Sequence, residues 1–397
     1  MKLQRRGFLQ CSAVAALLLA NPHLAFAALK AQSVYNATRY LFISDTESSF
    51  VTVFDVVNGE QVGLLEFDLV PEIVEISRDD SKMVVGNTQQ PKLVLSDLIS
   101  HQRQEFVLPS PPYQAHFMPR SKQLLVAMKD QVGVINYQTA ELTLYPQRSN
   151  AIDAEISSQS KFLYSSFTEN NWLLDSAKPR IYKKSVSDEL DEPWVALDLH
   201  SRMQIDSGFK EGIISPENYL LAFTSRESNE GFVYFPGEDK LVSTGVLGSS
   251  SAVGSTMVEP YMDSLFMRIL FANQETGDIA LYKFLDGDEW QHFKVDFSPR
   301  MFRSGWLDRT WILGGDGGLL FQAYDNPDDR VFHKLPGEVL DMWVSGDSKT
   351  LYLTVDHGSP RVLRYDIRRR EALDAIPVHG VIKSTMLRMG SNNSICY

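Results

Sequence analysis

The chain has 397 residues, of which 44% are hydrophobic and 22% charged, and its formal net charge at pH 7 is −12. This length is enough for one large domain or two ordinary domains, each with a sizeable core. The acidic balance disfavours binding to nucleic acid and to anionic lipid, and it favours solubility or a basic protein partner.

Residues 1–27 are predicted to be a targeting segment. A positively charged start precedes an apolar run at residues 13–20, which is too short to span a bilayer. Small residues before Ala27 place signal-peptidase cleavage after that residue. The pair Arg5-Arg6, followed by Gly-Phe-Leu, resembles the twin-arginine export motif, and an ordinary Sec signal is the alternative. We therefore expect a protein that is exported to the periplasm.

Cleavage after Ala27 would remove three basic residues and no acidic one, leaving 35 basic and 50 acidic residues and a net charge of −15. It would also remove Cys11, so that Cys396 would be the single cysteine of the mature chain. One thiol permits no internal disulfide, and its role is left open. No later segment is long and apolar enough to span a membrane.

The remaining residues, 28–397, are predicted to form one all-β domain. Short runs of Val, Ile, Leu, Phe and Tyr are separated by turn residues and fall into sets of four. The fourth set carries a predicted insertion at about 170–179. The eight sets lie at 40–67, 73–108, 114–145, from about 152, 208–246, 265–296, 301–333 and 339–375.

A strand-turn-strand phrase recurs along the chain at intervals of about forty residues. It is clearest at Pro71–Gly86 and is repeated around Ile213 and around Trp343. Internal repetition of strands at this period is typical of a β-propeller, whereas a β-sandwich does not repeat a turn phrase. We predict eight four-stranded antiparallel blades, with seven as the alternative.

The first predicted set lacks one strand, and the tail at 381–387 could supply it. The first blade would then be shared between the two ends of the chain, which would close the ring and remove exposed sheet edges.

Two short motifs resemble those of YVTN-type propeller repeats. Ser77-Arg-Asp-Asp-Ser-Lys, with looser copies at Ser157 and Ser345, is similar to that family's Ser-x-Asp-Gly-Lys turn, and Asp55-Val-Val-Asn-Gly is similar to its Asp-x-x-Thr-Gly hairpin. Within that superfamily, exported chains of this size resemble the large propeller subunit of quinone-dependent amine dehydrogenases and, less closely, lactonase-type propellers. The resemblance implies the fold, and it carries over no catalytic residue.

Function in propellers usually resides at the mouth of the central channel, on loops that lead into the innermost strands. Charged, imidazole and phenol groups that converge there can bind a polar ligand, a metal or a partner's side chains. The alternative for each residue is that it merely lines a water-filled channel. The candidate ligand-binding residues are Glu72, Tyr113, His116, Asp153, Glu155, Arg300, Arg303, Glu338, Asp341 and His379.

His116 and His379 are the leading candidates because each begins a predicted innermost strand. A register slip of one residue would turn either side chain into the core. Two histidines with an acidic group could ligate zinc or iron, but no His-x-His, His-x3-His or cysteine pair is present. No motif for covalent haem or for a serine nucleophile is present, and Gly314–Gly318 is predicted to be a hairpin turn.

Three functions are compatible with these patterns. The first is an exported, non-catalytic binding platform or accessory subunit. The second is the propeller subunit of a periplasmic quinone- or haem-dependent oxidoreductase, in which a partner chain carries the redox group. The third is a lactonase-like or metal-dependent hydrolase that uses the channel residues. No recognisable motif specifies a cofactor, and the expected partner is a periplasmic protein, such as a redox subunit or a co-exported protein.

Overall fold

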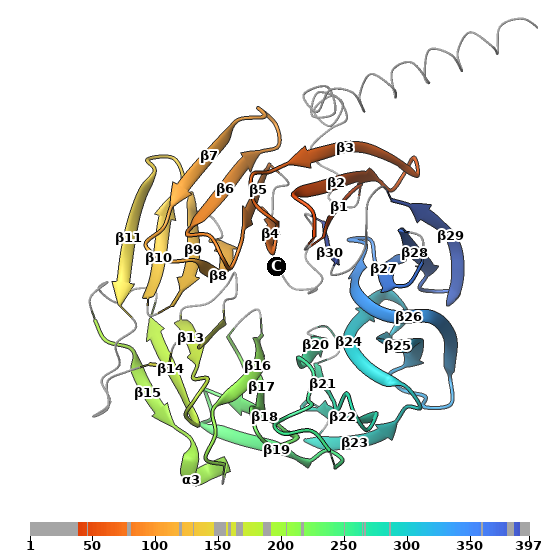
Figure 1. Cartoon of the computed structure of the whole chain (residues 1–397). Coiled ribbons are helices and arrows are strands. Elements are labelled where there is room, and N and C mark those ends of the chain that lie inside the picture. Colours follow the sequence, from red (N-terminus) through yellow and green to blue (C-terminus); the bar gives the residue numbers. More distant parts are fainter. Residues whose placement is uncertain are drawn as a thin grey trace, which may run out of the picture. The chain divides into compact units, whose positions relative to one another are not determined.

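A computed structural model describes residues 39–389, except 46, 78–80, 119–120, 130, 147–155, 158–159, 164–169, 186–191, 204, 216–217, 250, 264, 266, 286, 359 and 379–384. The regular secondary structure of the described residues is almost entirely β-strand (Figure 1). The two short helical segments are α3 (His200–Met203) and the 3₁₀ turn η1 (Trp306–Asp308). No described helix has the length and apolar character needed to cross a membrane.

The strands form antiparallel sheets, most of them built from four consecutive strands. The first sheet contains β1 (Tyr40–Asp45), β2 (Phe50–Asp55), β3 (Glu60–Glu66) and β30 (Thr385–Arg388). The second contains β4 (Ile73–Ile76), β5 (Lys82–Gly86), β6 (Lys92–Asp97) and β7 (Arg103–Val107). The third contains β8 (Pro112–Phe117), β9 (Gln123–Met128), β10 (Gln131–Asn136) and β11 (Glu141–Pro146).

The next three sheets follow the same order. The fourth contains β12 (Lys161–Leu163), β13 (Asn170–Leu174), β14 (Arg180–Ser185) and β15 (Val195–Asp198). The fifth contains β16 (Phe209–Ile214), β17 (Leu221–Ser225), β18 (Glu230–Phe235) and β19 (Lys240–Val246). The sixth contains β20 (Tyr261–Asp263), β21 (Arg268–Ala272), β22 (Asp278–Lys283) and β23 (Glu289–Lys294). The insertion predicted at 170–179 is wrong in part, because residues 170–174 are strand β13.

The last sheet has six strands: β24 (Ser298–Gly305), β25 (Thr310–Ala323), β26 (Arg330–Val344), β27 (Thr350–Asp356), β28 (Arg361–Asp366) and β29 (Glu371–Pro377). The described strands therefore make a propeller of seven sheets, and the prediction of eight separate blades is wrong. The predicted seventh set ends at residue 333 and the eighth begins at residue 339, on either side of Pro336-Gly337. In the structure β26 runs unbroken through that point and joins both sets into one hydrogen-bonded sheet.

The glycine-rich segment Gly314–Gly318 lies inside β25, where the chain turns back. The amide of Tyr324, just beyond β25, donates to the carbonyl of Arg309, just before it, so the two ends of this strand lie together. Gly317 has a φ of +72°, a conformation that glycine adopts without strain. The chain reversal that the sequence predicts here is therefore present.

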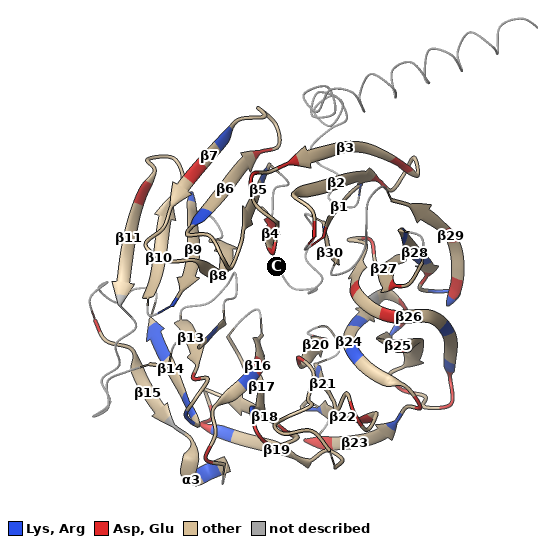
Figure 2. Ribbon diagram, viewed as in Figure 1, with Lys and Arg blue, Asp and Glu red and all other residues tan. Residues whose placement is uncertain are grey.

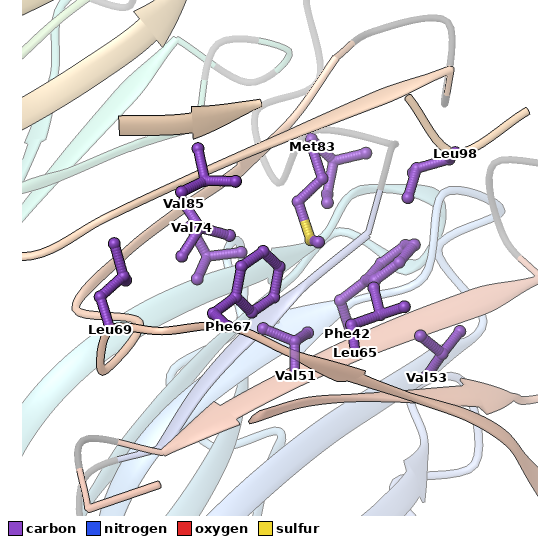
Figure 3. Packing of buried hydrophobic residues seen from close by; sticks show 12 residues of the cluster. Phe42, Val51, Val53, Leu65, Phe67, Leu69, Val74, Met83, Val85 and Leu98 are labelled. Carbon is purple, nitrogen blue, oxygen red and sulfur yellow. The ribbon is translucent and has the colours of Figure 1, made fainter. Parts of the chain in front are cut away.

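The two ends of the chain share the first sheet, as predicted. β30 pairs antiparallel with β1, and Phe42 lies opposite Arg388 in the register. Alternation along β1 sends successive side chains to opposite faces, and both faces are buried. Phe42 packs into one core cluster with residues of β2 to β6 (Figure 3), whereas Leu41 and Ile43 pack into another with Tyr352 and Val362.

The two motifs that resemble YVTN-type repeats both form hydrogen-bonded turns. The Oδ1 atom of Asp55 accepts hydrogen bonds from the amides of Val57 and Asn58, an Asx turn that closes the hairpin between β2 and β3. The same turn recurs at Asp97, Asn136, Asp175 and Asn273. In the serine phrase, Ser77 Oγ accepts from the amide of Lys82 at 2.9 Å and Ser345 Oγ from that of Thr350 at 3.0 Å.

The described chain divides into two compact units. Unit 1 consists of residues 39–117, 340–366 and 371–389, and unit 2 of residues 118–339 and 367–370. Each unit has hydrophobic clusters of its own.

Candidate functional site

In unit 1, an imidazole and a carboxylate from neighbouring edge strands form a pair. His116 is on β8 and Glu75 on β4, which is marked by its acidic residue in Figure 2. Glu75 Oε2 lies 2.9 Å from His116 Nδ1, and Glu75 Oε1 accepts a hydrogen bond of 2.9 Å from the amide of Phe117. Both side chains are about 30% exposed (29% and 30%), so the pair is neither buried nor freely rotating in solvent.

Local sequence explains why Glu75 faces this way. The strand Ile73-Val-Glu-Ile buries Val74 and Ile76, and alternation leaves Glu75 on the partly exposed side. Because an ionised carboxylate only accepts hydrogen bonds, the Nδ1 atom of His116 must carry the proton in this pair. In neutral imidazole, Nε2 is then the nitrogen with the basic lone pair.

A second ionic pair lies beside the same strand. Asp341 Oδ2 accepts hydrogen bonds from the amide of Leu387 at 2.8 Å and from Arg388 Nη1 at 3.1 Å. Arg388 Nε reaches the carbonyl of Val74 on β4 at 3.2 Å, and its guanidinium lies 5.4 Å from the ring centroid of Trp343. Arg388 therefore links β30, β26 and β4, and Asp341 holds the C-terminal strand in place.

Two of the predicted residues, His116 and Asp341, thus have partners that lie on or contact β4: His116 pairs with Glu75, and Asp341 pairs with Arg388 of β30. Sequence reasoning missed those partners, Glu75 and Arg388. Glu75 appears within the first repeated phrase, and the alternation of Ile73-Val-Glu-Ile could have indicated its direction. No local signal identifies Arg388, because its partners Asp341 and Val74 are 47 and 314 residues away in the chain.

Two further predicted residues lie in the described part of unit 1: Glu72 directly precedes β4, and Tyr113 is on β8. Glu72 accepts hydrogen bonds from the amide and hydroxyl of Thr88, the amide at 2.8 Å. Tyr113 lies on β8 and is partly buried. His379 is outside the described residues, as are Asp153 and Glu155.

In unit 2, Arg300 and Arg303 lie on β24, the strand with two basic residues in Figure 2. A register shift occurs between Pro299 and Met301, so Arg300 occupies a β-bulge, and its guanidinium forms an ion pair with Glu338. Arg303 Nη1 donates to the carbonyl of Phe302 at 2.7 Å. Two predicted residues, Arg300 and Glu338, therefore neutralise each other.

Unit 2 also holds an ionic cluster that sequence reasoning missed. Lys161 Nζ on β12 lies 2.5 Å from Glu211 Oε2 on β16 and 2.7 Å from Glu259 Oε1. Burial disfavours the ammonium form, but the charges of Glu259 and Glu211 outweigh it and raise the pKa of Lys161. The amine therefore stays charged and serves as a cation between carboxylates. Within the described residues, no group of three or more His, Cys, Asp or Glu side chains has the arrangement of a metal site.

No protein-family model and no curated protein sequence matches this chain. Solved structures do match it. The dihydro-haem d1 dehydrogenase NirN, in complex with DHE, aligns with a TM-score of 0.70 at 12% identity over 90% of this chain and 76% of that chain. Apo AztD from Citrobacter koseri aligns with a TM-score of 0.61 at 10% identity over 89% of this chain and 98% of that chain. At this identity the likeness shows a shared β-propeller fold.

Proposed function

We propose that this chain is the propeller subunit of an exported oxidoreductase that works with a haem or quinone group, and that His116 lies at the site where that group or its carrier binds. The observation that carries the proposal is the His116–Glu75 pair on the edge strands β8 and β4. The fold shared with a dihydro-haem d1 dehydrogenase supports the same reading. The proposed kinship with amine dehydrogenase subunits and YVTN repeats rests on the sequence motifs alone.

The His116–Glu75 pair has a chemistry that suits the binding of a haem or a quinone. A histidine that donates its Nδ1 proton to a carboxylate is held in one tautomer and one ring orientation, as outer-shell carboxylates hold metal-bound histidines. A bound haem or quinone would supply the electron transfer, for which side chains have no equivalent.

In this proposal Glu75, Asp341 and Arg388 position His116 and the strands around it. Glu75 holds the Nδ1 proton of His116 and, through the amide of Phe117, fixes the end of β8. Asp341 and Arg388 keep β30 against β4 and so maintain the strand that carries Glu75. None of these residues performs the electron transfer itself.

We further propose that residues 1–27 direct the chain to the periplasm by twin-arginine export. That route carries folded proteins, so the chain would cross the membrane with its propeller formed, either alone or bound to a partner. The non-catalytic binding platform is the less specific form of the proposal, and it requires the same fold and the same export.

The test is purification of the tagged full chain from the periplasm of its native host, followed by a visible spectrum and mass spectrometry of the complex. We expect a stoichiometric partner with haem or quinone absorbance. His116→Ala should remove or shift the absorbance bands. His292→Ala, which alters an exposed histidine stacked on Trp290, is the matched control and should leave them unchanged.

A colourless complex would overturn the oxidoreductase proposal and leave the binding platform. Bands that are identical in the wild type and in His116→Ala would show that the redox group binds elsewhere.

A further inference from the structure

We propose that one end of the sheets in unit 2 is a docking face for a partner protein that presents apolar side chains within a basic rim. The face consists of the described residues of six turns, namely 215 and 218–220, 236–239, 265 and 267, 284–285 and 287–288, 306–309, and 324–329, and we call it the hairpin face. It involves neither His116 nor Glu75, so the inference goes beyond the proposed redox site.

Topology gathers these turns at one end. In an antiparallel sheet of consecutive strands, the first and third turns lie together and the second lies at the opposite end. Contacts between sheets confirm the arrangement. Lys240, beside the β18–β19 turn, forms an ion pair with Asp288 of the β22–β23 turn, and Asp325 pairs with both Arg268 and Arg309.

Large apolar side chains are exposed on this face. Their exposed fractions are 42% for Tyr219, 47% for Leu265, 64% for Leu285 and 53% for Leu307. At the opposite end of unit 2, the large exposed apolar residues are Val246, the last residue of β19 (74%), and Val253, within the part of the chain that the structure describes. Single exposed apolar residues are ordinary, but a group on one face, rimmed by charge, is typical of a protein interface.

Tyr219 has the properties of a rigid anchor. Its ring lies 5.6 Å from that of Phe235 and 5.9 Å from that of Phe284, both of which are buried. Its amide donates to Ser215 Oγ at 2.7 Å. The preceding Asn218 adopts a left-handed φ of +58°, and its side chain accepts a hydrogen bond from Trp172.

This scaffold orders the ring before any partner arrives. A preordered aromatic side chain loses little conformational entropy on binding, which is why such residues dominate interface energies. Leu285 directly follows Phe284 in the chain and is itself exposed.

The charges on the face indicate the chemistry of the partner. Most cations here are already paired within the chain, including Arg202 with Asp239 and Lys240 with Asp288. Two exposed acidic side chains, Glu238 and Asp328, have no ion-pair partner among the described residues. The whole chain has a net charge of −12. A partner with a basic rim around an apolar centre complements both features.

The experiment uses the full chain expressed in its native host, with a photo-crosslinking benzoylphenylalanine placed at 219, at 285 or, as the control, at 253. We expect positions 219 and 285 to cross-link to one and the same protein and position 253 to give no such product. The double variant Tyr219→Ser with Leu285→Ser should reduce co-elution of that protein at least tenfold. The single variant Leu285→Ser, at a residue that is 64% exposed, should reduce it at an unchanged melting temperature. Glu238→Lys should reduce its association at low salt.

The inference is overturned if positions 219 and 285 give no cross-link, if position 253 gives the same product in equal yield, or if the double variant co-elutes its partner as the wild type does. The spectrum of the cross-linked partner separates this inference from the proposed function. A colourless partner captured at 219 and 285 would support the hairpin face as a docking site for a protein other than the redox carrier, whereas the spectrum of His116→Ala tests the redox site separately.

Discussion

Asp97 and Asn136 occupy the same position in two hairpins, yet only the aspartate can form an ion pair. Each side chain accepts two backbone amides in an Asx turn. Asp97 also accepts a hydrogen bond of 2.7 Å from Lys82 Nζ. Burial disfavours ionisation of Asp97, but the bonds from Lys82, Ser100 and Ile99 outweigh it and lower its pKa to about 2.

This difference makes Asp97→Asn a clean test of the ion pair, because asparagine keeps the turn. A carboxyl whose pKa is lowered in the folded state stabilises the protein above its unfolded pKa, and that contribution disappears as the pH falls through the folded pKa. We expect Asp97→Asn to cost about 1–2 kcal/mol at pH 7 and almost nothing near pH 2. Urea unfolding curves at both pH values measure it, and an equal cost at both would contradict the ion-pair explanation.

The second prediction at this scale concerns Glu75. Glu75→Gln keeps the size of the side chain but allows its amide to donate toward His116, so the tautomer of the imidazole should change. We expect a loss of about 1 kcal/mol in stability and altered ¹⁵N shifts of both His116 ring nitrogens. Glu72→Gln, whose partner is Thr88, serves as the control and should leave those shifts unchanged. Unaltered shifts in Glu75→Gln would show that this carboxylate does not set the tautomer.

At the scale of elements, β30 depends on a contact distant in sequence. Asp341 is buried and accepts the amide of Leu387 together with the guanidinium of Arg388. Removal of the carboxylate would leave a buried amide and a cation without their acceptor. We expect Asp341→Ala to cost about 3 kcal/mol and Asp341→Asn less, because asparagine still offers an oxygen to the amide.

Chemical denaturation measures this loss, and hydrogen exchange of the Leu387 amide should show that β30 opens first. Arg368→Ala is the control, because Arg368 is highly exposed and 3.9 Å from Asp308, and it should change stability by less than about 0.5 kcal/mol. Equal effects of Asp341→Ala and Arg368→Ala would show that Asp341 does not hold β30.

The doubling back of β25 depends on glycine. A Cβ atom on Gly315 would overlap the backbone carbonyl oxygen of Ser298 on β24, and backbone cannot move aside as a flexible side chain can. Gly237, in another turn, has no atom near its Cβ position. We expect Gly315→Ala to cost about 1–3 kcal/mol and Gly237→Ala to be close to neutral. Thermal unfolding distinguishes them, and a neutral Gly315→Ala would mean that β24 can shift.

At the scale of the whole molecule, the proposed export route makes a direct prediction. Substitution of both Arg5 and Arg6 by lysine keeps the charge but removes the paired arginines of the twin-arginine-like motif. We expect the full-length precursor to accumulate in the cytoplasm, whereas Gln4→Ala should be exported as the wild type is. Cell fractionation and immunoblotting measure both, and normal export of the double lysine variant would favour the Sec route.

The fold class followed from sequence because its causes are local. Asx turns at Asp55 and Asp97, the serine turns, and strands that bury alternate residues all depend on neighbours only a few positions away. The pairing of β1 with the tail of the chain was also predictable, because the first predicted set had one strand fewer than the others.

The number of sheets did not follow from local patterns. Residues 334–338 separate two predicted blades, yet β26 runs from Arg330 to Val344 and pairs with β25 on both sides of Pro336-Gly337, Lys334 with Gly318 and Glu338 with Asp316. A turn signal describes the preference of a few residues, whereas ladder pairing depends on strands that lie elsewhere in the chain.

By itself, the sequence determined the class of fold, the repeating turns and the residue types of the candidate site, since these depend on composition and short spacing. Only the tertiary structure decided which groups meet. It paired His116 with Glu75, directed Asp341 to β30, set Arg300 against Glu338 and exposed Tyr219 on a rigid support. Each of these contacts joins residues far apart in the chain, and their distance in space is set by the packing of sheets, which short-range patterns do not encode.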